Sequence, residues 1–295
     1  RVLGSCHQPG EAFVSFDGHQ DNDFKPYLFK TTDFGKTWKN ITADIPEGMV
    51  INVIAEHPRN ANLLFVGTEF GLFISTNGGK NWVLAGGNLP RVPVDDIIVN
   101  PKDNDLILGT HGRGIIVLDD ITWLEKLDES VLNSEAHLFP IREATQFYEM
   151  RALPDPGASR FSGPNPDYGV LITYYLKNDS PQEEKPPLKK EKSEKAEEKP
   201  NAPNVPKVKI VIEDKDGKLI RTLEGPDRKG INRINWDLRY PLSFEEKGEE
   251  GWFGPPKGPF VLPGEYTVKL VARNQELVQK ASLRIDPQAK TNPEA

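Results

Sequence analysis

The segment GTHGRG (109–114) offers the best candidates for chemistry in this 295-residue chain. His111 titrates near neutral pH and can serve as an acid, a base or a ligand. Arg113 can hold a carboxylate or sulfate group through two parallel hydrogen bonds. Because residues 67–69 (GTE) match residues 109–111 (GTH), we expect Glu69 to face the same space. Glu69, His111 and Arg113 are therefore predicted to converge on a central channel. The commoner alternative for such residues is structural, with His111 and Arg113 holding neighbouring strands together.

The acidic segment DGHQDND (17–23) is a weak candidate for a hard cation, through Asp17, Asp21 and Asp23. Carboxylate oxygens suit calcium and magnesium, but the spacing matches no calcium-binding loop. The five histidines, at positions 7, 19, 57, 111 and 137, show no zinc-ligand spacing. The sequence therefore predicts no metal and no cofactor.

Two pairs of adjacent carboxylates, at positions 95–96 and 119–120, raise the question of glycoside hydrolysis. Glycosidases hold two carboxyl groups ~5–10 Å apart, whereas adjacent residues of a strand point to opposite faces. The sequence also carries no phosphate-binding glycine loop, serine elbow or Cys–His nucleophile motif. Catalytic residues are therefore left unassigned.

A repeated octet indicates which elements position these residues. TTDFGKTW (31–38) returns 44 residues later as STNGGKNW (75–82). A short polar side chain can accept hydrogen bonds from backbone amides two residues on, and glycine permits a positive φ. The tryptophan is expected to fold back and bury a large aromatic surface. The residues predicted to hold these turns are Asp33, Gly35, Trp38, Asn77, Gly79 and Trp82.

Short apolar runs surround both octets, and they repeat with them. The runs are VINVIAEHP (50–58), NLLFVGTEFGLFIS (62–75), VDDIIVNP (94–101) and DLILGTHGRGIIVLDD (105–120). About four strands in a period of roughly 40–50 residues is typical of a β-propeller blade. Residues 1–122 are thus predicted to form two to three blades. Since closed propellers need at least about four and an open arc leaves strand edges exposed, we expect missing blades, on the same precursor or another chain.

The octets resemble the Asp box, or BNR repeat, of sialidases and sortilin-type (VPS10) propellers. GTHGRGIIVLDDIT, together with DFKPYLFKTTDFGKTW and NLLFVGTEFGLF, resembles the last blades of bacterial sortilin/BNR-type proteins, often labelled glycosyl hydrolase. In those families the Asp box stabilises the fold away from the active site. The resemblance implies a secreted or periplasmic protein, with any signal upstream of this chain.

Three functions follow from this resemblance. The first is a scaffold that binds a protein or carbohydrate ligand, without established catalysis. The second is a BNR-type glycoside hydrolase acting in the channel, although the sialidase arginine motif and Tyr–Glu pair have no counterpart here. The third is a structural subunit of a larger assembly.

The second half of the chain is predicted to be a β-sandwich that follows a connector, residues 123–169. One short helix is predicted over 122–133, at the start of this connector, and an edge strand within 137–150. Six strand-like runs between 170 and 288, with a buried Trp236, indicate an immunoglobulin-like domain. Their order resembles the FlgD-type Ig domains of secreted bacterial proteins. Residues 289–295 form a tail.

Two inserts interrupt these strands. Residues 179–206 are highly charged and almost free of apolar side chains, which predicts disorder. Residues 243–260 place Trp252, Phe253 and Phe260 among glycine and proline, either as an exposed binding loop or packed on the propeller.

Composition limits the partners. The net charge of −7 argues against nucleic acid, and no apolar run approaches the roughly 20 residues of a membrane span. The single cysteine, Cys6, rules out an internal disulfide.

Overall fold

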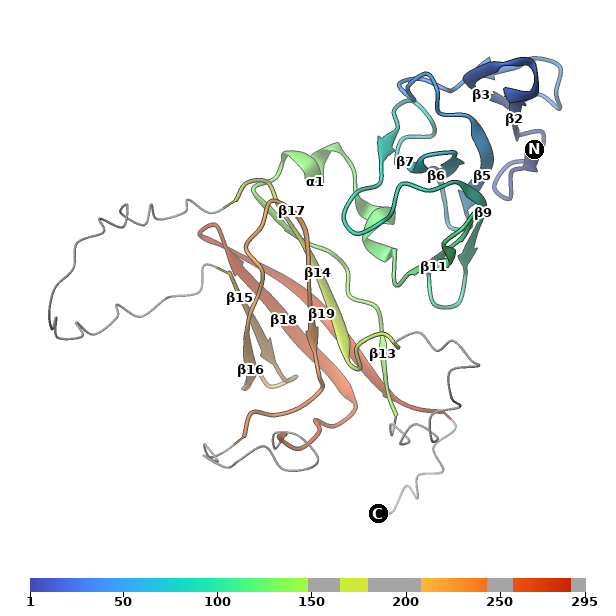
Figure 1. The fold of residues 1–295 in the computed structure, drawn as a ribbon. Helices are drawn as coiled ribbons and strands as arrows, with labels where there is room; N and C mark the ends of the chain where they lie inside the picture. Colours follow the sequence, from blue (N-terminus) through green and yellow to red (C-terminus); the bar gives the residue numbers. More distant parts are fainter. Residues whose placement is uncertain (148–164, 180–207, 243–256, 288–295) are drawn as a thin grey trace, which may run out of the picture. The chain divides into compact units, whose positions relative to one another are not determined.

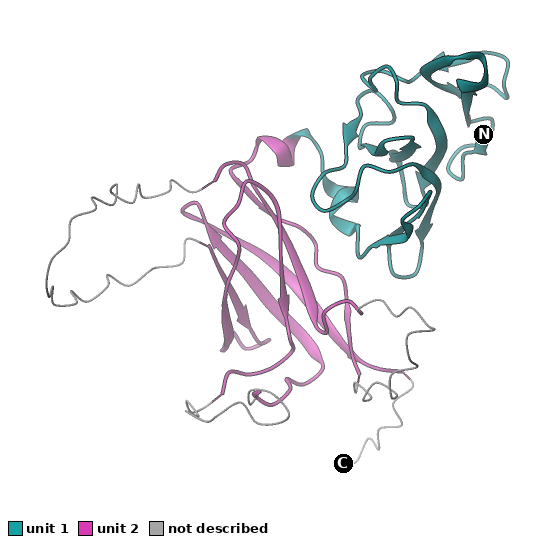
Figure 2. Ribbon diagram, in the orientation of Figure 1, with its two compact units in different colours: residues 1–129 teal, residues 130–295 magenta. Residues whose placement is uncertain are grey.

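The computed structural model describes residues 1–147, 165–179, 208–242 and 257–287 (Figure 1). The chain divides into two compact units, Arg1–Glu129 and Ser130–Ala295 (Figure 2). Almost all regular structure is β, as predicted.

The first unit contains three antiparallel sheets in which consecutive strands are neighbours. Sheet A consists of β1 (Val2–Gly4), β2 (Ala12–Gly18), β3 (Asp23–Thr31) and β4 (Lys39–Asn40), with the 3-10 helix η1 (His19–Asp21) between β2 and β3. Sheet B consists of β5 (Ile51–His57), β6 (Asn60–Thr68), β7 (Gly71–Ser75) and β8 (Val83–Leu84). Sheet C consists of β9 (Val94–Asn100), β10 (Asp105–Thr110) and β11 (Gly114–Leu118). This is a partial β-propeller of nearly three blades.

Sheet B lies between sheets A and C, and both of its faces are buried (Figure 1). Successive side chains of a strand point to opposite faces. In β6, Leu64 and Val66 belong to the core shared with sheet A, whereas Leu63 and Phe65 belong to the core shared with sheet C. The continuous apolar run of β6 therefore serves two separate cores, which is the packing expected of a central blade.

The predicted single helix over 122–133 is wrong. The segment forms the 3-10 helix η2 (Thr122–Lys126) and the α-helix α1 (Glu129–Asn133). Between them Leu127 is extended (φ −80°, ψ 103°), which breaks the helical path. No helix in the described part of the chain is long and apolar enough to cross a bilayer.

The second unit is a sandwich of two sheets around one core. Sheet D consists of β12 (Ala136–Leu138), β14 (Val170–Leu176) and β17 (Gly230–Trp236). Sheet E consists of β13 (Ala144–Gln146), β15 (Val208–Glu213), β16 (Leu219–Glu224), β18 (Gly264–Ala272) and β19 (Gln275–Ile285). The predicted strands and the full burial of Trp236 are confirmed. The finer assignment, to an immunoglobulin-like domain, stays a prediction.

The predictions for the two inserts fall largely outside the described residues, which exclude 180–207 and 243–256, and the tail lies outside them as well. Phe260 is described. It packs edge-to-face on Tyr168, and the Arg239 guanidinium lies 3.6 Å from its ring centroid. Phe260 therefore packs within the second unit.

Candidate functional site

The octet turns are held by nearly identical hydrogen bonds. The Asp33 Oδ1 oxygen accepts from the Thr37 backbone N–H at 2.9 Å, and the Asn77 Oδ1 oxygen accepts from Asn81 N–H at 3.0 Å. In both turns the donating backbone N–H lies four residues after the accepting side chain, so the predicted spacing of two residues was wrong. The hydrogen bonds that Asp33 accepts hold its pKa below its ordinary value, and the bond from the Thr37 N–H contributes most. The assignment of these turns as structural Asp boxes stays a prediction.

Glycine and a hydroxyl residue complete each turn. Gly35 and Gly79 have φ of +82° and +84°, as predicted. Their backbone N–H groups donate to the hydroxyls of Thr31 (3.0 Å) and Ser75 (2.9 Å). The hydroxyl at the first octet position, Thr31 or Ser75, therefore also holds the turn, a role that the sequence pattern did not reveal.

The two octet tryptophans differ in their surroundings. Trp82 is 4% exposed, packs in the core between sheets A and B, and donates from Nε1 to the Ile41 carbonyl at 2.9 Å. Trp38 is 43% exposed and donates to Gly35, within its own turn. The expected burial is therefore confirmed for Trp82, which a neighbouring sheet covers. Trp38 is only partly buried, because no neighbouring sheet covers it within the described residues.

Glu69 and His111 occupy equivalent positions in sheets B and C. The Glu69 N–H donates to Val50 (3.1 Å) and the His111 N–H to Pro93 (3.0 Å), each just before the first strand of its sheet. The His111 side chain is 83% exposed and its Nδ1 lies 3.7 Å from Asp95. Arg113, also exposed, lies in the same β10–β11 turn. Within the described residues, no hydrogen bond or ion pair joins Glu69 to His111 or Arg113, and their convergence stays a prediction.

A different set of polar residues meets near these turns. Asp17, Asn52 and Asp95 line a cavity of about 410 Å³ together with Arg1, Ser15 and Ile51. The Nδ2 amide of Asn52 is buried there without a hydrogen-bond partner. This cavity draws on all three sheets, and it is where the structure brings the acidic segment close to Asp95.

The acidic segment is used mainly to build its own turn. Asp17 accepts from the backbone N–H and the ring of His19, which lowers its pKa. Asp23 accepts from the Tyr27 hydroxyl (2.7 Å) and the Lys25 N–H, which lowers its pKa too. Asp21 lies in η1. In the described part of the chain, these carboxylates do not gather as ligands for one ion.

The opposite ends of the sheets carry a partly buried network that the sequence did not reveal. His57, fully buried at the end of β5, has Nε2 3.0 Å from the Asn104 Oδ1 oxygen. Asn104 donates to Glu125 at 2.7 Å, and Glu125 also pairs with Arg59 at 2.7 Å. Burial lowers the pKa of His57. Burial disfavours the ionised form of Glu125, but the bonds from Arg59 and Asn104 outweigh it and lower the pKa.

This network ties η2 to the turns of sheets B and C, so its role is structural. The sequence offered one signal for it, the match of His57-Pro58 with Asn100-Pro101 at the same turn of successive sheets. That match gave no indication that Glu125 closes the network.

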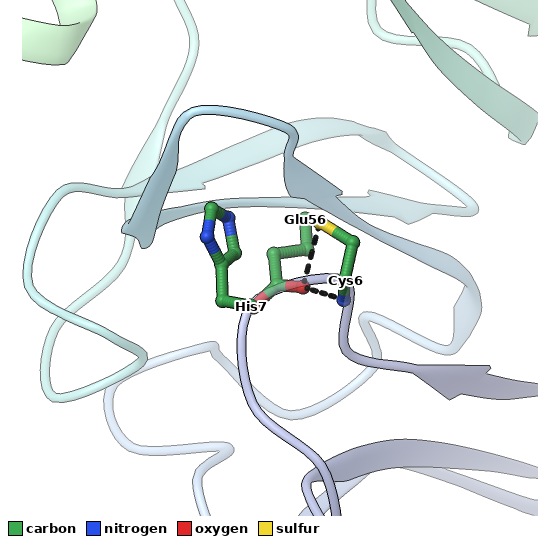
Figure 3. Close-up of side chains that lie close together, drawn as sticks. All are labelled: Cys6, His7 and Glu56. Atoms are coloured by element: carbon green, nitrogen blue, oxygen red, sulfur yellow. Dashed lines mark hydrogen bonds between the residues drawn. The ribbon is translucent and has the colours of Figure 1, made fainter.

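A second cluster lies at the same ends of the sheets. Cys6 and His7, in the β1–β2 loop, meet Glu56 of β5, and one donor atom from each lies within 4.8 Å of the others (Figure 3). The Cys6 backbone N–H donates to Glu56 at 3.0 Å, and its thiol lies 3.6 Å from the same oxygen. Partial burial, followed by the charge of Glu56, raises the pKa of the thiol. Sequence spacing could not reveal this cluster, because about 50 residues separate Glu56 from Cys6 and His7.

Comparison with known proteins identifies no family. No protein-family model and no curated protein matches the chain. Among solved structures, an ancestral GH74 enzyme aligns at 24% identity over 38% of this chain and 13% of its own, with a TM-score of 0.32. The extracellular domain of a putative one-component system from B. thetaiotaomicron aligns at 14% identity over 98% and 31%, with a TM-score of 0.30. YCF48 bound to D1 peptide aligns at 12% identity over 92% and 63%, with a TM-score of 0.26. The chain thus spans less than two thirds of each of these structures.

Proposed function

We propose that the first unit is a protein-binding scaffold, and that its partner is a further antiparallel sheet of the same blade type. That sheet belongs to the same precursor or to another chain. The observation that carries the proposal is that sheets A and C each bear apolar side chains on the face turned away from sheet B.

The outer face of sheet A is aromatic. Phe16 is 56% exposed and packs edge-to-face on Phe29 of the adjacent strand, with ring centroids 6.0 Å apart. Val2 and Trp38 are exposed as well. Val2 pairs with Val14 and Phe29 pairs with Val14 across the ladder, so these three residues share one face. Phe29 also pairs with Asn40, and Trp38, two residues before Asn40, belongs to the same face by strand alternation. A sheet with one solvated face normally alternates apolar and polar residues, and sheet A departs from that rule.

The outer face of sheet C is aliphatic. Ile107 pairs with Ile98 and Val117 on its two neighbouring strands, which places all three on one face. Ile115, two residues before Val117, is 74% exposed. These side chains are distinct from Leu106 and Leu108, whose side chains fill the core against sheet B.

The interface between sheets A and B indicates what would cover sheet A. There the Trp82 ring enters the core of the preceding sheet beside Ile41, and its Nε1 donates to the carbonyl of that residue. Trp38 is the equivalent residue one sheet earlier, and it lacks such a neighbour. An outer strand with an aliphatic side chain and a free carbonyl would therefore complete the site around Trp38. Full burial of each such aromatic side chain contributes about 1.5–3 kcal/mol.

Two carboxylates of the first unit, Asp33 and Glu125, are unsuited to serve as the acid of a glycoside hydrolase. Asp95 lies near His111, and Asp120 accepts from the Thr122 N–H at 3.1 Å. The pKa values of Asp33 and Glu125 are lowered by hydrogen bonds, whereas a glycosidase acid needs a raised pKa.

We further propose a secreted or periplasmic location. This proposal rests on the sequence resemblance alone, and cell fractionation tests it.

Site-specific photocrosslinking in the source cell tests the scaffold proposal. A photoreactive phenylalanine at position 16 is expected to crosslink to a β-strand segment outside residues 1–295, identified by mass spectrometry. The control position is Val83, which is equally apolar and 70% exposed but lies on the outermost strand of sheet B. Crosslinks from both positions at equal yield, or none from position 16, would refute the proposal.

A further inference from the structure

We propose that Cys6, His7 and Glu56 form a binding site for a divalent cation of the zinc type. The three residues supply one sulfur, one nitrogen and one oxygen donor, all within 4.8 Å of one another (Figure 3). Zinc is bound in proteins by this mixture of ligands, usually four in number at about 2.0–2.3 Å. Harder cations such as magnesium prefer oxygen ligands alone.

The ring of His7 is held in one tautomer, which leaves one nitrogen able to bind a metal. The Nε2 atom of His7 lies 2.8 Å from the carbonyl oxygen of His57. Because a carbonyl oxygen can only accept, Nε2 carries the proton and Nδ1 keeps the free lone pair. Metal-binding histidines almost always donate their other ring N–H in this way, to a carbonyl or a carboxylate.

The carboxylate is oriented by the loop that carries the other two ligands. The Ser5 hydroxyl donates to one oxygen of Glu56 at 3.0 Å, and the Cys6 N–H donates to the other at 3.0 Å. Ser5 also accepts from the His7 N–H at 3.1 Å. The loop conformation that presents the thiol and the imidazole is therefore the one that fixes the carboxylate.

Exposure suits a site that an ion can reach from solvent. Cys6 and His7 are exposed, whereas Glu56 is partly buried on β5. Three protein ligands leave a fourth position for water or an external ligand, as in catalytic rather than structural zinc sites. The alternative is that Glu56 serves only as a hydrogen-bond acceptor that orders the β1–β2 loop, and this alternative requires no affinity for metal.

Metal titration of the whole chain separates these possibilities. Under reducing conditions, Co²⁺ is expected to bind at one ion per chain with thiolate-to-metal absorption, and Zn²⁺ is expected to displace it. Cys6→Ala should abolish this absorption. His7→Ala and Glu56→Gln should each weaken Zn²⁺ binding at least about tenfold, the lower bound for loss of a supporting partner. The proposal is independent of the scaffold proposal, because no sheet partner is needed.

His19→Ala is the matched control, because His19 is also an exposed histidine next to a carboxylate, with Nδ1 2.6 Å from Asp17. Zn²⁺ affinity should be unchanged in this variant. Circular dichroism establishes that each variant is folded. Cys6→Ala is the decisive variant, because Cys6 is exposed and its truncation should leave the fold intact even if Glu56→Gln unfolds the β1–β2 loop. Absence of Zn²⁺ binding, binding of undiminished affinity in Cys6→Ala, or loss of binding in His19→Ala would each overturn the proposal.

Discussion

Truncation of the two octet tryptophans should have very different effects, although the octets are near copies. Trp82→Ala removes a fully packed indole and its hydrogen bond to Ile41. Large-to-small changes of buried Trp cost about 3–5 kcal/mol. Trp38→Ala removes a side chain that is 43% exposed and bonded within its own turn, so a cost of roughly 1–2 kcal/mol follows from the smaller buried area.

Native-state hydrogen exchange measures this difference within the first unit without assuming two-state unfolding of the whole chain. The reporters are the amides of Leu64 and Val66, which lie in the core between sheets A and B. A difference of about 2 kcal/mol means roughly thirtyfold faster exchange in Trp82→Ala than in Trp38→Ala. Similar exchange in the two variants would show that sheet A does not cover Trp82, and the stacking of sheets would be wrong.

Three further predictions concern positions away from the open faces. Gly79→Ala should destabilise the first unit more than Gly35→Ala, since both have positive φ but the new Cβ would lie 3.0 Å from Ile41 only at position 79; thermal unfolding checks the order. Burial holds the pKa of His57 below its ordinary value of 6.5, so the unfolded chain binds a proton more readily and the free energy of unfolding falls as pH drops below that value. In His57→Gln the free energy of unfolding should fall less over the same pH range, as measured by denaturant melts at several pH values. Trp236→Ala should cost the second unit about 3–5 kcal/mol, seen as faster exchange of the amides of β17; unchanged exchange would refute its place in the core.

Much of the first unit was predictable because its signals are local. The octets fix two turns through residues only two to four positions apart, and the apolar runs bound the strands. Stacking of the sheets follows from period and strand number. The failed predictions are also instructive: a helix over 122–133 satisfied the apolar spacing, but an extended Leu127 splits it.

The candidate sites were less predictable because they depend on contacts between distant residues. Repetition correctly put Glu69 and His111 in equivalent places, yet equivalence does not determine where side chains point. The Cys6–His7–Glu56 cluster and the pairing of Asn104 with Glu125 join residues from different strands and turns. No spacing rule within one segment could have identified them.

Oxidative footprinting of Trp38 tests the central claim most directly, by comparing this chain alone with the protein as its cell makes it. If the outer face of sheet A binds a further sheet, oxidation of Trp38 in the source protein should fall to the low level of Trp82, while Val83 stays as reactive as in the chain alone. Equal oxidation of Trp38 in both preparations would contradict the claim.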